Sequence, residues 1–91
     1  MKNFKLLLVD DEEALRVVTK KMLEHLGFEV LMAANGQEAL EIYRQKGKNI
    51  EAVLLDLTMP EMDGEETFRE LKKIDENVKV IVASGYSTQE N

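Results

Sequence analysis

The sequence has no cysteine and no tryptophan, and Pro60 is its one proline among 91 residues. Without cysteine, the chain cannot form a disulfide bond, a thiolate metal site or a thiol nucleophile. It also lacks a long hydrophobic run near its start, because the first apolar stretch extends only to Val9 and acidic residues follow. Such a stretch is too short for a signal peptide or a membrane span, so we expect a cytoplasmic location and no membrane partner.

Positive charge is also scarce. The sequence has 12 Lys and Arg residues against 18 Asp and Glu residues, which gives a formal net charge of −6. Nucleic acids and anionic membranes are bound by clustered basic residues, so we expect no direct nucleic-acid contact. A small cation site stays open, because it needs only a few carboxylates. The length and the apolar share of 44% indicate one small globular domain over residues 1–91.

Four short apolar runs predict β-strands. They lie at Lys5–Val9, Phe28–Ala33, Ala52–Leu55 and Val80–Ala83. The first, third and fourth runs are nearly continuous, which is typical of strands buried on both faces of a parallel sheet. The second run is weaker and suits the edge of a sheet.

Three helical segments separate these strands. The first ends at Gly27, the second runs from about Gly36 to Lys46 before Gly47, and the third covers about residues 64–74. The apolar residues of the first segment that we expect in the core are Leu15, Val18 and Met22. Each segment starts with a pattern like a capping box. The paired residues are Asp10 with Glu13, Asn35 with Glu38, and Asp63 with Glu66.

Strands that alternate with helices predict an α/β fold, in which a doubly wound parallel sheet carries helices on both faces. Val80–Ala83 has the composition of an interior strand, yet only polar or small residues follow it. An apolar strand at a sheet edge is prone to pairing. We therefore expect either that further sequence once followed this strand or that another chain covers it.

Polar residues follow three of the strands and suggest a site. Asp10 and Asp11 come after the first strand, Asp56 ends the third, and Ser84 follows the fourth. Ligands of open α/β sheets bind beyond the carboxyl ends of the strands, so the three aspartates converge if the first and third strands are neighbours. Converging carboxylates need a cation or a raised pKa, and their hard oxygens suit Mg²⁺. An Asp carboxylate there could act as a nucleophile and form an acyl phosphate.

Three motifs carry a resemblance to a known family. They are Leu-Leu-Val-Asp-Asp-Glu at residues 7–12, Leu-Leu-Asp-Leu-Thr-Met-Pro-Glu-Met-Asp-Gly at 54–64 and Val-Ala-Ser-Gly-Tyr at 82–86. Together they resemble the receiver domains of response regulators in two-component signalling. The resemblance implies a flavodoxin-like sheet with strand order 2-1-3-4, and a phosphohistidine donor on a sensor histidine kinase or a histidine phosphotransfer domain.

The resemblance also implies a role for individual residues. Asp56 is the expected phosphorylation site, Ser84 the switch hydroxyl and Tyr86 a residue that borders the site. The expected Mg²⁺ ligands are Asp10 through water, Asp11, Asp56 and the backbone carbonyl of Thr58. A receiver of this kind is not an enzyme beyond its own phosphorylation and slow dephosphorylation.

The sequence also departs from the family pattern. Receiver domains have five strands and a lysine at the end of the fifth, whereas this sequence predicts four strands. We therefore expect a receiver truncated after the fourth strand, with the fifth strand and the last helices missing. The alternative is a phosphorylation-incompetent fragment that forms a homodimer through its exposed fourth strand.

An enzyme of another class is the remaining alternative. A Mg²⁺-dependent phosphohydrolase on a similar sheet would use Asp10, at the end of the first strand, as its nucleophile. That class usually has Asp-x-Asp spacing, whereas Asp10 and Asp11 are adjacent here. Nucleotide binding is not expected, because the sequence has neither a dinucleotide glycine pattern nor a P-loop.

Overall fold

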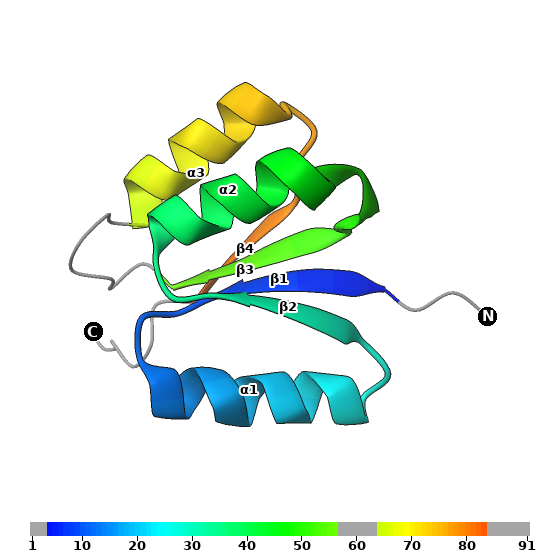
Figure 1. The fold of residues 1–91 in the computed structure, drawn as a ribbon. Helices are drawn as coiled ribbons and strands as arrows, with labels where there is room; N and C mark the ends of the chain where they lie inside the picture. The colour runs from blue at the N-terminus through cyan, green and yellow to red at the C-terminus, as the bar shows by residue number, and fades with distance from the viewer. Residues whose placement is uncertain (1–3, 57–63, 84–91) are drawn as a thin grey trace, which may run out of the picture.

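The computed structural model describes residues 4–56 and 64–83. The elements in chain order are β1 (Lys5–Val9), α1 (Glu13–His25), β2 (Glu29–Ala33), α2 (Gly36–Lys46), a 3₁₀ helix (Gly47–Asn49), β3 (Ala52–Asp56), α3 (Gly64–Ile74) and β4 (Val80–Ala83). The strands form one parallel sheet in the order β2-β1-β3-β4, and α1 covers one face while α2 and α3 cover the other (Figure 1). The predicted fold class and strand order are confirmed.

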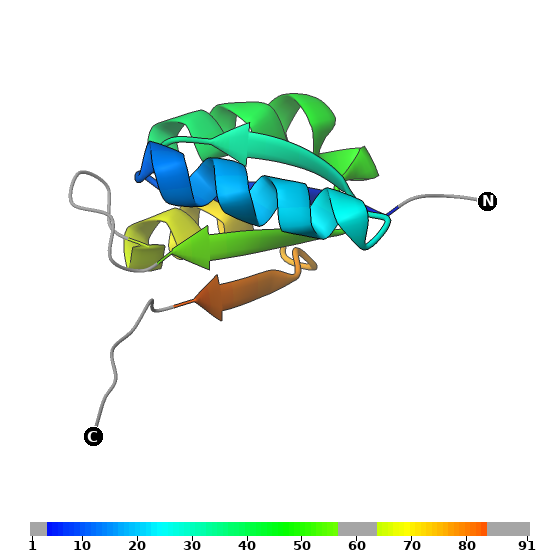
Figure 2. The same ribbon diagram turned by 90° about the horizontal axis from the view of Figure 1, so that it is seen from below.

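The strand register brings the carboxyl ends of the strands to one edge of the sheet. Val9 at the end of β1 is paired with Ala33 of β2 on one side and with Leu55 of β3 on the other. Asp56 is paired with Ala83 at the end of β4. The arrowheads of β2, β3 and β4 accordingly point the same way (Figure 2). Side chains that follow these strand ends are therefore neighbours.

The main core lies between the sheet and the two helices on its α2–α3 face. Alternate residues of β1 and β3 point to this face, because side chains alternate along a strand. The buried cluster consists of Leu7, Val9, Ala33, Ala39, Leu40, Tyr43, Ile50, Val53, Leu55, Leu71 and Val78. This cluster holds β1 and β3 together, and both strands lead into the predicted site.

The opposite face of the sheet is covered less completely. In the described part of the chain, α1 contributes no buried residue. Leu15, Val18 and Met22 are 42%, 53% and 59% exposed, so the prediction that they lie in the core is wrong. Among the described elements, α1 lies alone on its face, as Figure 1 shows, so it has no neighbouring helix to cover its flanks. It still shields the sheet beneath it, where Leu8 and Val30 are buried.

The helix starts follow the capping predictions in one case and depart from them in another. The Asn35 side chain accepts a hydrogen bond from the Glu38 backbone N–H at 2.9 Å, and the Glu38 carboxylate accepts one from the Ala34 N–H at 2.8 Å. α1 instead begins after Glu12, whose side chain makes no capping bond. Asp10 lies too far ahead of this helix to cap it. Of the predicted pair Asp63 and Glu66, Asp63 lies outside the described residues.

The two glycines predicted to end helices act for different reasons. Gly27 has a φ of 103°, and its N–H donates to the Glu24 carbonyl at 3.0 Å while the Phe28 N–H donates to the Leu23 carbonyl at 3.0 Å. This is a Schellman motif, which requires a left-handed residue. Gly47 has an ordinary right-handed φ of −56° and leads into the 3₁₀ helix.

A glycine is needed at position 47 because there is no room for a side chain beside the Tyr43 ring. An added Cβ at this position would lie 2.9 Å from Cε2 of the Tyr43 ring, which is closer than real contacts allow. The ring itself is buried, and its hydroxyl donates to Oδ2 of Asp75 at 2.9 Å. Asp75 follows α3, so this hydrogen bond ties α2 to α3 across the layer that covers the core.

The same hydrogen bond gives a pH prediction. Burial, with the hydrogen bond and charge of Asp75, raises the pKa of Tyr43 from 10.0 to about 12. The folded state therefore favours the neutral phenol, and the resulting stability is complete below pH 10 and is lost as the pH rises from 10 through about 12. Tyr43→Phe should lower the free energy of unfolding by about 1–2 kcal/mol at neutral pH. The gap between parent and variant should narrow between pH 10 and 12 in parallel urea titrations.

The parent and Tyr43→Phe carry the same lysines, so the titration of these lysines cancels when the two stabilities are compared. A gap between the two chains that stays constant from pH 7 to pH 12 would contradict the assigned role of the Tyr43 hydroxyl.

Candidate functional site

The predicted site lies where β1 and β3 end side by side. Val9 and Leu55 are register partners, so Asp10 and Asp56 are the next residues on two adjacent parallel strands. The expected adjacency of the first and third strands is thus confirmed for the backbone. The Asp56 side chain lies outside the described side chains, although its backbone is part of β3.

Asp10 is held from several directions. It is only 8% exposed, and its N–H donates to the Ala33 carbonyl at 3.1 Å. Its Oδ1 accepts a hydrogen bond from the Glu12 N–H at 3.0 Å, and its carbonyl oxygen accepts one from Nη1 of Arg16 at 2.7 Å. A buried carboxylate is costly unless polar partners compensate it. The Glu12 N–H provides such a partner for the carboxylate, and the two backbone bonds fix the orientation of Asp10.

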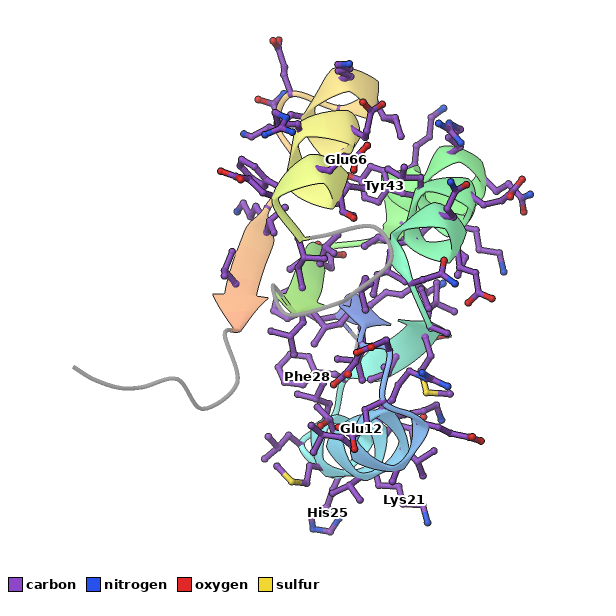
Figure 3. The ribbon with its side chains drawn as sticks, turned by 90° about the vertical axis from the view of Figure 1, so that its left-hand side faces the viewer. Glu12, Lys21, His25, Phe28, Tyr43 and Glu66 are labelled. Carbon is purple, nitrogen blue, oxygen red and sulfur yellow. The ribbon has the colours of Figure 1, made fainter. Side chains whose placement is uncertain are left out.

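The residues that follow Asp10 are exposed. Asp11 and Glu12 lie in the loop that joins β1 to α1, and Glu13 is the acidic residue in the first turn of this helix. Figure 3 looks onto this edge of the sheet, where Glu12 lies close to the end of the sheet. Lys21, further along α1, points away from the sheet in the same view. The loop therefore offers carboxylates to solvent directly beside the buried Asp10.

Negative charge gathers at this edge for a topological reason. In consecutive β-α-β units each helix follows the carboxyl end of a strand, and the first turns of all three helices lie near the same edge of the sheet (Figure 1). Their acidic residues are Glu13, Glu38, Glu65 and Glu66. Acidic side chains are favourable at helix N-termini because of the helix dipole. The edge therefore gathers acidic side chains from all three helices.

Other predicted site residues fall outside what the structure describes. Thr58, Ser84 and Tyr86 belong to residues 57–63 and 84–91, which are not described. Among the described residues, no three His, Cys, Asp or Glu side chains lie close enough together to share a metal ion. Asp10 and Asp11 are thus the predicted metal ligands whose side chains the structure places at this edge.

Sequence reasoning missed Arg16. Its contact with Asp10 joins residues six positions apart across a loop, and no periodicity in the sequence marks such a contact. A basic residue that follows a run of acidic ones is a weak signal, because it equally suits an exposed helix surface.

Comparison with known families gives the deciding observation. Residues 6–91, nearly the whole chain, match the response regulator receiver domain family. The chain belongs to this family. The receiver is 38% identical over 86 residues to sporulation initiation phosphotransferase F of Bacillus subtilis, covering 94% of this chain and 68% of that protein. It is 44% identical over 81 residues to the sensor kinase CckA of Brucella abortus, covering 89% of this chain but only 9% of the kinase.

The fold of the receiver agrees with that of solved relatives. The response regulator protein TrrA of Thermotoga maritima, solved in complex with Mg²⁺ and BeF, superimposes with a TM-score of 0.83 at 36% identity. The match covers 92% of this chain and 71% of TrrA. The receiver is thus a phosphoaccepting signalling module of two-component systems, which favours the receiver interpretation over the phosphohydrolase one. Among its described helices, none is long and apolar enough to cross a membrane.

Proposed function

We propose that Asp56 is the residue that accepts the phosphoryl group in this receiver. The observation that carries the proposal is the register of β1 and β3, which places the backbone of Asp56 beside that of the buried Asp10. From the described residues, this edge offers the carboxylates of Asp10 and of the exposed loop that follows it. A carboxylate oxygen of Asp56 would attack the phosphorus of a phosphohistidine. The new P–O bond forms as the P–N bond breaks, and the departing imidazole keeps the electron pair and takes up a proton from water.

The donor set fits Mg²⁺. Carboxylate and carbonyl oxygens are the hard ligands that this ion takes, and Asp10 is already oriented by the Glu12 N–H and by Arg16. The proposed ligands are Asp10, Asp11, Asp56 and the carbonyl oxygen of Thr58. Bound Mg²⁺ would neutralise carboxylate charge that otherwise repels the incoming phosphoryl group. The Mg²⁺ and BeF complex of TrrA supports this choice of ion.

Two further residues complete the proposal. The Ser84 hydroxyl would donate a hydrogen bond to a phosphoryl oxygen after transfer, and Tyr86 would border the site. The donor would be a sensor histidine kinase or a histidine phosphotransfer domain, since the relatives include a sensor kinase and a phosphotransferase. Apart from its own phosphorylation and slow dephosphorylation, the receiver would catalyse no reaction.

Intact-protein mass spectrometry tests this function. Incubation with Mg²⁺ and acetyl phosphate should add a single phosphoryl group, and peptide mapping should place it on the segment that contains Asp56. Chelation of Mg²⁺ by EDTA should suppress the adduct, because the ion neutralises the carboxylates around the acceptor.

The opposite result would favour the other candidate. A folded chain that gains no phosphoryl group and has a dimeric mass by light scattering would favour self-association through β4. Ile81 and Val82 of this strand are 55% and 49% exposed, and they face opposite sides of the sheet because side chains alternate along a strand.

A further inference from the structure

Arg16 reaches back from α1 to the loop that carries the acidic residues. Its backbone N–H donates to the Glu12 carbonyl at 2.9 Å, which anchors it in the first turn of the helix. Its guanidinium Nη1 donates to the Asp10 carbonyl at 2.7 Å, and the side chain is half-buried. The contact therefore runs from the helix to the peptide group that links Asp10 to Asp11.

Holding this carbonyl fixes more than one atom. A peptide group is planar, so a fixed Asp10 carbonyl also fixes the direction of the Asp11 N–H and of the bond from that nitrogen to the Asp11 Cα. Two other bonds act on the same short segment: the Asp10 N–H bonds to Ala33, and the Glu12 N–H bonds to the Asp10 carboxylate. The loop is thus held by hydrogen bonds to β2, to the Asp10 carboxylate and to α1.

The group that the Arg16 guanidinium contacts indicates the role of this residue. Arg16 contacts a neutral carbonyl oxygen, whereas a residue that served mainly to neutralise charge would be expected to pair with a carboxylate. The arrangement suits a residue that orients the loop.

We propose that Arg16 is a positioning residue, which sets the directions of the Asp10 and Asp11 carboxylates for Mg²⁺ without touching the ion. The inference rests on the proposed metal site. Arg16 acts through the peptide group between the two aspartates, as outer partners of metal ligands do in other sites.

Positioning and charge predict opposite effects for one substitution. Arg16→Gln removes a positive charge close to the acidic loop, and on charge alone Mg²⁺ should bind more tightly. If Arg16 positions the ligands, Mg²⁺ should instead bind about tenfold more weakly, which is at the lower end of the loss typical for such partners. The sign of the change therefore separates the two explanations.

The dissociation constant of Mg²⁺ should be measured by calorimetry and by the amide chemical shifts of residues 10–13. Lys21→Gln is the matched control, because it makes the same charge change on the same helix at an exposed position that points away from the sheet (Figure 3). The control should keep the parent dissociation constant to within about twofold, because salt screens exposed and distant charges. Urea unfolding in EDTA should show that each variant is folded.

Unchanged or tighter Mg²⁺ binding in folded Arg16→Gln would overturn the role of Arg16 and leave the metal site of the parent intact. Absence of Mg²⁺ binding in the parent would overturn both proposals. If Arg16→Gln does not fold, Arg16→Met replaces it, because methionine keeps an unbranched side chain but has no hydrogen-bond donor for the Asp10 carbonyl. Weaker binding in that variant supports positioning, and unchanged binding overturns it.

Discussion

Asp56→Asn is expected to abolish the phosphoryl adduct. Asparagine has nearly the shape of aspartate, so β3 and its pairing with β1 should be preserved, but its amide lacks the anionic oxygen that attacks phosphorus. The substitution also removes one of the negative charges that attract Mg²⁺. Labelling by acetyl phosphate should fall by at least about 100-fold, as expected when the nucleophile of a covalent step is lost. Intact-protein mass measured over a time course would show this loss.

Two comparisons make the result specific. Glu51→Gln makes the same carboxylate-to-amide change at an exposed residue beside the opposite end of β3, and it should label like the parent. Asp11→Asn should label slowly, with partial recovery at high Mg²⁺ concentration, because it weakens a ligand and leaves the nucleophile. An adduct that survives in Asp56→Asn and disappears in Asp10→Asn would instead identify Asp10 as the nucleophile.

Leu71→Ala is expected to cause the largest loss of stability. Leu71 is the fully buried leucine of α3, and it belongs to the cluster that packs against β1 and β3. Truncation of a buried leucine to alanine removes transferred apolar surface and leaves a cavity, at a cost of about 2–5 kcal/mol. A domain of this size has only about 5–10 kcal/mol of stability in total, so the variant should unfold at a much lower urea concentration.

Leu15→Ala is the matched control for this prediction. It makes the same substitution within a helix, but Leu15 on α1 is 42% exposed. The cost should be below about 1.5 kcal/mol, because the side chain leaves water only partly on folding. Equal losses in the two variants would contradict the view that the α2–α3 face supplies most of the packing.

Much of the fold follows directly from the sequence, because continuous apolar runs and helix-ending glycines are local signals. β1 and β4 were predicted with the bounds that the structure has, as were α2 and α3. The core assignment of α1 failed because periodicity shows which side of a helix is apolar and carries no information about what covers that side. Val18 and Met22 match the apolar spacing of the helix, yet both are exposed.

For the candidate site, the backbone arrangement was predictable from the sequence. The alternation of strands and helices, together with the apolar run that precedes each aspartate, was enough to bring Asp10 and Asp56 to one edge of adjacent strands. The part played by Arg16 could not be predicted, since the reach of a long side chain depends on the path of the loop before it. The capping role assigned to Asp10 failed for a related reason: its carboxylate binds the Glu12 N–H within the loop, ahead of the helix.

The sparse packing of α1 against the sheet affects the order in which parts of the receiver unfold. Cooperative units with few buried side chains open at a lower free energy than the whole domain. α1 contributes no buried residue in the described part of the chain, whereas α2 and α3 are anchored in the core. Arg16 belongs to α1, so sub-global opening of this helix would release the Asp10 carbonyl while the rest of the sheet remained folded. The positions of the acidic residues at this edge are thus kept only while α1 stays folded against the sheet.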